Sequence, residues 1–179
     1  MNEKQLKVLK KNNEESREFT RNCLSAALIV LLNKDKLDDI SITKLCQVAG
    51  VSRMAFYRNY NSIEDVLEDK INDFAHRLAS QITTDIYDNW YMVFKEAQKD
   101  KELFEILIKL KSEHKVYDVF MTMLPKKEDN RTIQSIWLGL YYTFIIKWVK
   151  EGKPKKIEDA ARVAYKYTKN IALIESSKD

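Results

Sequence analysis

The sequence predicts an all-helical protein, and three observations lead to this fold class. The 179 residues include only 3 Gly and 2 Pro, far below the roughly 12% that average usage gives these two types together. Apolar residues recur at steps of three and four along most of the chain, which is the spacing of helices with a buried face. Hydrophobic residues at 45% and charged residues at 32% are typical of a folded helical protein. Sandwiches, doubly wound folds and glycine-rich phosphate loops need more glycines and are excluded.

The N-terminal region is predicted to contain an arm and then a helix. Residues 1–13 are polar and carry four lysines, so we expect a basic arm that is frayed or partly helical. From Glu14 onward the apolar side chains predict a helix that ends near Asn33. Its expected buried residues are Phe19, Cys23, Leu24, Ala27, Leu28 and Leu31.

Two short helices are predicted after the turn-rich residues 33–40. Thr43 is the expected N-cap of the first helix, and Gly50 suits a left-handed C-cap because glycine has no Cβ that clashes at positive φ. Ser52 is expected to cap the second helix, which extends to Tyr60 and points Phe56 into the core. The pattern over residues 41–60 is that of a helix-turn-helix.

The charge distribution indicates what the helix-turn-helix binds. Residues 1–60 carry 11 Lys and Arg against 7 Asp and Glu, so the net charge of +4 lies there and residues 61–179 are neutral. Residues 40–63 include no acid, and such a surface attracts a polyanion. Because the second helix of this motif enters the DNA major groove, we expect a DNA-binding domain over residues 14–62. Its leading residues Arg53, Met54 and Ala55 would meet base edges, and its flanking residues Tyr57, Arg58 and Asn59 would meet phosphates.

The residues from Ile42 to Ser52 and from Phe56 to Ser62 together resemble the N-terminal signature of the tetracycline-repressor (TetR/AcrR) family of bacterial transcriptional regulators. The resemblance covers about residues 14–70. It implies that Thr43 and Tyr57 hold DNA phosphates and that the leading residues of the second helix approach bases. The candidate DNA-binding residues are Thr43, Lys44, Ser52, Arg53, Met54, Ala55, Tyr57, Arg58 and Asn59.

This sequence departs from the family pattern at three places. Ile63 stands where the family commonly has a lysine that reaches the DNA backbone, and Asn59 stands where a histidine is frequent. Residues 33–40 lack the usual glycine. We expect the basic arm from Lys4 to Lys11 to compensate for the missing phosphate contact.

The remaining residues, 63–179, are predicted to form a larger helical domain. By resemblance, this domain binds an effector and dimerises, with its last two helices pairing with a second subunit as a four-helix bundle. The helix predicted over residues 128–151 is apolar nearly all round and must be covered on two sides, which agrees with such pairing. The expected helices span 63–83, 85–99, 100–111, 114–124, 128–151 and 157–174. The candidate dimer-interface residues are Ile136, Leu140, Phe144, Ala161, Ala164 and Ala172.

Aromatic side chains are concentrated in this second domain. Of the 19 Phe, Trp and Tyr residues, 12 lie between Tyr87 and Trp148. One interpretation is a pocket for a small-molecule effector, and the other is ordinary packing of the same rings in a core. The candidate pocket residues are Trp90, Phe94, Phe104, Phe120, Trp137 and Tyr141.

Several other classes of protein are not expected. His76 and His114 are the only histidines, and no Cys or His spacing suits a metal site or a catalytic triad, so we expect no metal, no cofactor and no enzyme. The longest apolar runs are shorter than the ~20 residues that cross a bilayer. We therefore expect a cytoplasmic protein with no membrane contact.

The expected function is sequence-specific regulation of transcription. The chain would bind a near-palindromic operator on double-stranded DNA as a homodimer, act as a repressor and be released by an unknown small-molecule effector. A second hypothesis stays open, in which the chain is a helical protein-interaction module with weak or no specific DNA binding, and Ile63 is the residue that favours it.

Overall fold

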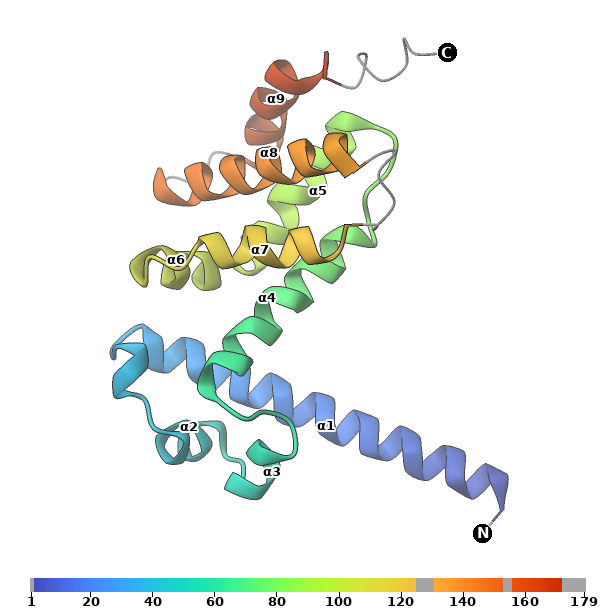
Figure 1. Ribbon diagram of the computed structural model, residues 1–179, viewed down its shortest axis with the longest axis vertical. Helices are drawn as coiled ribbons and strands as arrows, with labels where there is room; N and C mark the ends of the chain where they lie inside the picture. The colour runs from blue at the N-terminus through green and yellow to red at the C-terminus, as the bar shows by residue number, and fades with distance from the viewer. Residues whose placement is uncertain (1, 125–130, 153–155, 172–179) are drawn as a thin grey trace. The chain divides into compact units, whose positions relative to one another are not determined.

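The computed structural model describes residues 2–124, 131–152 and 156–171, and all regular elements in these ranges are helices (Figure 1). The predicted all-helical class is therefore confirmed. The elements are α1 (Glu3–Leu32), the 3-10 turn η1 (Leu37–Asp39), α2 (Ile42–Ala49), α3 (Arg53–Tyr57), α4 (Ile63–Ala79), α5 (Ile86–Lys99), α6 (Lys101–Lys109), α7 (His114–Thr122), α8 (Arg131–Lys150) and α9 (Ile157–Thr168).

The chain forms two compact units, which we call the N-terminal unit, up to Lys70, and the C-terminal unit, from Ile71. The division lies inside α4, whereas the residue pattern predicts a boundary between Ser62 and Ile63. The difference arises because the first turns of α4 contribute Val66 to the core of the N-terminal unit. Each unit is described by itself below.

Helix α1 begins much earlier than the residue pattern predicts. Asn2 caps it, because the backbone N–H of Lys4 donates to Asn2 Oδ1 at 2.9 Å and the Asn2 N–H donates to Gln5 Oε1 at 3.0 Å. The arm expected to be frayed or partly helical is thus the regular start of a helix of 30 residues, about 45 Å long at 1.5 Å per residue.

The first half of α1 projects beyond α2 and α3 (Figure 1). Residues 4–19 are all exposed, and Phe19, which was expected in the buried face, is 69% exposed. The buried face of α1 starts at Leu24, where the helix meets α2 and α3. Tertiary packing therefore covers only the second half of this helix.

The C-terminal unit is organised around α5 and α8. Helix α8 packs against α5, α6 and α7, and α9 packs against α5. Trp90 of α5 is fully buried, its ring lies 4.9 Å from that of Tyr141 and 4.8 Å from that of Phe144, and its Nε1 donates to Thr168 Oγ1 at 2.7 Å. This tryptophan ties α5 to both α8 and α9.

Helix α4 ends at Ala79 rather than near Thr83, because the chain after it is held by a side chain of α5. Asn89 Oδ1 accepts from the Thr83 N–H at 2.8 Å, and Asn89 Nδ2 donates to the Thr83 carbonyl at 2.8 Å. These bonds take the backbone of Thr83 out of the helical pattern.

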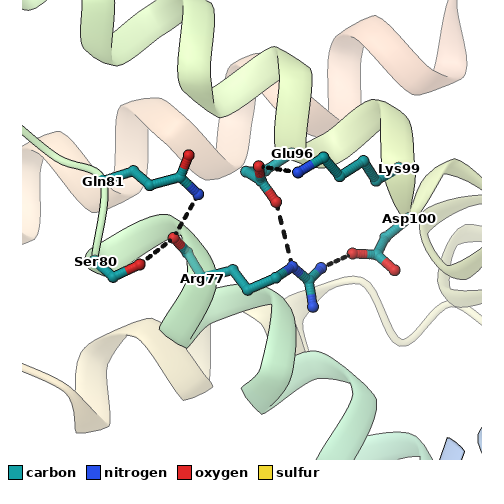
Figure 2. A network of polar contacts seen from close by, with 6 residues as sticks. All are labelled: Arg77, Ser80, Gln81, Glu96, Lys99 and Asp100. Atoms are coloured by element: carbon teal, nitrogen blue, oxygen red, sulfur yellow. Dashed lines mark hydrogen bonds and ion pairs between the residues drawn. The ribbon is translucent and has the colours of Figure 1, made fainter.

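An ion network joins the end of α4 to α5 (Figure 2). Arg77 Nε donates to Glu96 Oε2 at 3.2 Å and its guanidinium pairs with Asp100, while Lys99 Nζ pairs with Glu96 Oε1 at 2.5 Å. Burial of Glu96 opposes its ionisation, but hydrogen bonds from Lys99, Gln81 and Arg77 outweigh burial and lower the pKa of this carboxyl. The buried charge is therefore compensated, as such charges must be.

Within the described ranges, no helix has both the length and the apolar character needed to cross a membrane.

Candidate nucleic-acid interface and ligand cavity

Helix α2 starts and ends with local signals. Ser41 is its N-cap, with its Oγ accepting from the Lys44 N–H at 3.1 Å, so the prediction that Thr43 caps this helix is wrong. Thr43 lies in the first turn and is exposed. Gly50 has φ 66°, which confirms the predicted left-handed C-cap. The turn after α2 thus has the geometry that a helix-turn-helix requires.

Helix α3 is short and anchored by one ring. Ser52 caps it as predicted, because its Oγ accepts from the Ala55 N–H at 3.1 Å. Phe56 is fully buried and is the expected anchor. The helix ends at Tyr57, before the predicted Tyr60, because the N–H groups of Asn59 and Tyr60 both donate to the Phe56 carbonyl at 2.9 Å and tighten the last turn.

The outward face of α3 presents a mixed basic and aromatic surface. Arg53, Met54, Tyr57 and Arg58 are exposed, with Met54 at 67% and Tyr57 at 51%. Arg53 and Tyr57 are four residues apart, as are Met54 and Arg58, so each pair forms one row on the helix surface. Guanidinium and hydroxyl donors in this position suit base edges and phosphates.

Three other positions are engaged within the N-terminal unit. Lys44 Nζ pairs with Asp35 Oδ2 at 2.9 Å, and Asn59 Nδ2 donates to the Ala55 carbonyl at 2.8 Å. Ile63 is only 7% exposed and packs in the core. The position where the TetR/AcrR sequence pattern commonly has a lysine is therefore a core position in this chain.

The turn between α3 and α4 is fixed by a carboxylate. Asp65 Oδ2 accepts from the N–H groups of Asn61 at 2.8 Å and Ser62 at 3.1 Å, and these bonds lower the pKa of Asp65. The Ser62 hydroxyl in turn accepts from the Asp65 N–H at 3.2 Å, so Ser62 caps α4.

The carboxylate of Asp69 accepts hydrogen bonds from both Arg21 and Tyr60. The residue pattern gives no sign of this contact, because the three residues come from separate segments of the chain.

The C-terminal unit contains a cavity of about 410 Å³. Of the six predicted pocket residues, Phe120, Trp137 and Tyr141 line it. Trp90, Phe94 and Phe104 do not, because they are fully buried in the helix core. The other lining residues are Ala75, Leu78, Ala79, Ile82, Thr83, Thr84, Ile86, Asn89, Met123, Leu124, Gln134 and Leu138.

Polar residues of this wall were missed by sequence reasoning. Gln134 lies at the start of α8 and faces a cavity whose other lining residues are mostly apolar, and Asn89 lies on the buried side of α5. A polar side chain on the inward face of an apolar helix is the signal that would have pointed to both, because buried polar groups need partners.

The predicted dimer residues fall into different environments. Ile136 is 46% exposed and Leu140 is partly exposed, so both are open to a partner. Ala161 and Ala164 have no exposed surface, because α9 packs its small residues against α5 of the same chain. These two residues therefore cannot contact a partner subunit directly, and their assignment to a dimer interface is corrected. Phe144 packs on Trp90. Ala172 lies outside the described residues.

Comparisons with known proteins identify solved structures that share this fold. No family model matches the chain, and no curated protein matches it. The Lin0861 protein of Listeria innocua superposes with a TM-score of 0.68 and 17% identity over 86% of this chain and 91% of its own. A protein of Syntrophomonas wolfei, described as a TetR-family transcriptional regulator, superposes with a TM-score of 0.63 and 17% identity. The match covers 90% of this chain and 96% of that protein. A TetR transcriptional regulator of Streptococcus agalactiae superposes with a TM-score of 0.53 and 18% identity. The match covers 88% of this chain and 97% of that protein.

These structures confirm the predicted resemblance at the level of the fold. The chain has the all-helical architecture of solved TetR-family regulators along most of its length.

Proposed function

We propose that this chain is a sequence-specific DNA-binding regulator of transcription that acts as a homodimer. In this proposal α3 reads base edges through Arg53, Met54 and Ala55, and Thr43, Lys44, Ser52, Tyr57, Arg58 and Asn59 hold phosphates. The regulator is a repressor that leaves a near-palindromic operator when a small molecule binds the C-terminal unit.

One observation carries the proposal. The exposed face of α3 bears Arg53, Tyr57 and Arg58, while Phe56 behind it is fully buried and Gly50 forms the left-handed turn before it. A basic, acid-free helix held this way is suited to the major groove. The fold shared with solved TetR-family regulators supports the same function.

The start of α1 adds to the phosphate contacts in this proposal. Lys4, Lys7, Lys10 and Lys11 lie on an exposed helix that projects beyond α2 and α3, and no acid occurs from Lys4 to Asn13. Since Ile63 is buried, this helix is the element that replaces the lysine contact of related regulators.

The C-terminal unit supports the ligand and dimer parts of the proposal. Its cavity has the size of a small-molecule site, which is commonly 300–1,000 Å³. Ala75, Leu78 and Ala79 of α4 line it, so a ligand acts directly on the helix whose first turns belong to the N-terminal unit. The exposed Ile136 of α8 supports a partner on that helix.

Selection from a pool of random duplexes tests DNA recognition by the full chain. We expect enrichment of an inverted repeat whose half-site centres lie one helical turn, about 10 bp, or a multiple of it apart. The enriched duplex should bind at least ~10³-fold more tightly than a scrambled duplex at 150 mM salt. No enrichment, or equal affinity for both duplexes, would contradict specific regulation.

A second candidate function is a protein-interaction module. The observation that favours it is the exposure of Val48 and Met54 on the helix-turn-helix surface, since apolar patches often mark protein interfaces. Salt dependence separates the two functions: DNA binding should weaken linearly in log K against log salt, by about 0.9 per phosphate contact. Replacing Lys4 and Lys10 with Gln should reduce this slope, and a flat dependence would favour the protein-interaction module.

A further inference from the structure

We propose that the cavity of the C-terminal unit binds an uncharged, largely apolar small molecule that offers one hydrogen-bonding group to the carboxamide of Gln134. The role of this molecule as the effector rests on the proposed function, but its chemical class does not. The class follows from the size of the cavity, the charge of its wall and the polar groups that the wall leaves without partners.

The size of the cavity suits an organic molecule. Its volume of about 410 Å³ equals that of about fourteen water molecules at ~30 Å³ each. Rings of Phe120, Trp137 and Tyr141 and the thioether of Met123 form part of its wall. Most of the wall surface is apolar, so an apolar ligand that fills the space removes that surface from water.

The described part of the wall disfavours ionic ligands, because it carries no charged side chain. None of the described residues that line the cavity is Asp, Glu, Lys, Arg or His. The ion network of Arg77, Glu96 and Asp100 is compensated within itself and contributes no lining residue. A carboxylate or an ammonium in the cavity would lose hydration without gaining a counter-charge, which is strongly unfavourable.

The two carboxamides in the wall, those of Asn89 and Gln134, differ in whether they have hydrogen-bonding capacity left for a ligand. Asn89 is already satisfied, because its side chain both accepts from and donates to the backbone of Thr83. Gln134 is not: its Oε1 is shielded from solvent and accepts no hydrogen bond from any described residue. Because the last bond of a Gln side chain rotates softly, its amide can turn to a ligand hydroxyl or amine.

Tyr141 adds a second neutral partner. Its ring packs against Trp90 and Trp137, and the residue lines the cavity. Burial raises the pKa of Tyr141 to about 12, so the hydroxyl stays protonated at neutral pH. The described part of the wall therefore offers hydrogen bonds without charge, which again fits a neutral ligand.

A matched series of naphthalenes tests the ligand class by calorimetry with the full chain. 2-Naphthol carries a hydroxyl, 2-methylnaphthalene replaces it with a methyl group, 2-naphthoate is an anion at pH 7 and 2-naphthylmethylammonium is a cation. We expect the two neutral compounds to bind and both ions to bind at least about tenfold more weakly. Binding of either ion as tightly as 2-naphthol would overturn the neutral class.

Three variants test whether the compounds bind in this cavity and whether 2-naphthol forms a hydrogen bond with Gln134. Gln134→Leu should shift the ratio of the 2-naphthol and 2-methylnaphthalene affinities by about fivefold toward the methyl compound, the value of one hydrogen bond. Gln98→Leu, on the exposed side of α5, is the matched control and should leave this ratio unchanged. Ala79→Phe should block both compounds, because Ala79 lines the cavity and is exposed, so that a larger ring enters without crowding the core.

The outcomes separate this inference from the proposed function. An unchanged ratio in Gln134→Leu would overturn the role of Gln134. If none of the four compounds binds while the chain still binds its selected duplex, the ligand class is wrong and the DNA-binding proposal stands. If 2-naphthol binds but leaves the duplex affinity unchanged, the ligand class is supported and the effector role is contradicted.

Discussion

The hydroxyl of Tyr60 donates a hydrogen bond to Oδ2 of Asp69 at 2.5 Å. Arg21 Nε donates to the same oxygen at 2.9 Å. One carboxylate of α4 is thereby joined to α1 and to the turn that follows α3. Burial and the bond to Asp69 raise the pKa of Tyr60, so its hydroxyl remains a donor throughout the neutral range. This contact holds the exposed helix α3 in place on the rest of the N-terminal unit.

Replacing Tyr60 with Phe should destabilise the N-terminal unit by about 1.5–3 kcal/mol, the usual value of a hydrogen bond to a charged group. Hydrogen exchange of peptides from residues 41–60, followed by mass spectrometry, measures this loss as faster exchange. Tyr57→Phe is the matched control, because Tyr57 is exposed and should leave exchange unchanged. Equal exchange in the two variants would show that the Tyr60 contact does not position α3.

Arg53→Ala and Tyr57→Phe should affect DNA binding in different ways. Arg53 begins α3, where base edges are reached, so its loss should cost about 1–3 kcal/mol on the preferred duplex and relax base preference. Tyr57 is predicted to hold a phosphate, and its loss should weaken binding to all duplexes alike. Fluorescence anisotropy with the selected duplex and its single-base variants measures both effects. A uniform loss in Arg53→Ala would contradict its role in reading bases.

Local signals explain why so much of the helix-turn-helix could be predicted from sequence. The left-handed Gly50, the cap at Ser52 and the anchor Phe56 depend on residues within a few positions of each other. The cap at Ser41 was missed because Thr43, only two residues away, has the same capping chemistry. Both residues carry a hydroxyl that can accept the first backbone N–H groups.

Tertiary packing explains what could not be predicted. Phe19 has the spacing of a buried residue but lies on the part of α1 that no other helix covers. Phe104 and Phe120 have similar apolar neighbours, yet only Phe120 reaches the cavity, because the helix arrangement decides which ring faces it. Ala161 and Ala164 indicate close helix packing, but spacing does not say whether the neighbouring helix belongs to the same chain.

The two glycines Gly50 and Gly139 should respond oppositely to Ala. At Gly50 an added Cβ meets nothing within 4 Å, so only the left-handed backbone is strained, at a cost of about 1 kcal/mol. At Gly139 the Cβ would lie 4.0 Å from Tyr117 Cε2, an ordinary contact, so Ala should stabilise α8 by about 1 kcal/mol within one chain. Hydrogen exchange of α2 and α8 peptides measures both changes, and stabilisation by Gly50→Ala would contradict the assigned turn.

Glu96→Gln should make the stability of the C-terminal unit less dependent on pH. The pKa of Glu96 is lowered from 4.5 in the folded chain, so its contribution is complete above that value and is lost as pH falls through the lower, folded pKa. We expect the variant to be about 2 kcal/mol less stable at pH 7, with the difference shrinking as the pH falls below 4.5 and through the lower, folded pKa. Urea unfolding followed by tryptophan fluorescence reports on this unit, because Trp90, Trp137 and Trp148 all lie in it.

Glu105→Gln is the matched control for that experiment. Glu105 pairs with Lys101 at 3.2 Å on the surface and is partly exposed, so its loss should cost less than about 0.5 kcal/mol at any pH. A pH-independent difference between the wild type and Glu96→Gln would show that the buried carboxylate acts only through packing.

Ile136→Lys should separate the proposed dimer into monomers. Ile136 is an exposed isoleucine on α8, and a lysine there would bury a charge against the partner helix, which is unfavourable without a counter-charge. Sedimentation equilibrium should show half the mass, and affinity for an inverted repeat should fall because one subunit holds only one half-site. Val30→Lys, at an exposed position of α1, is the control and should remain dimeric. A dimeric Ile136→Lys chain would place the interface elsewhere, with the exposed Val163 and Tyr167 of α9 as the next residues to test.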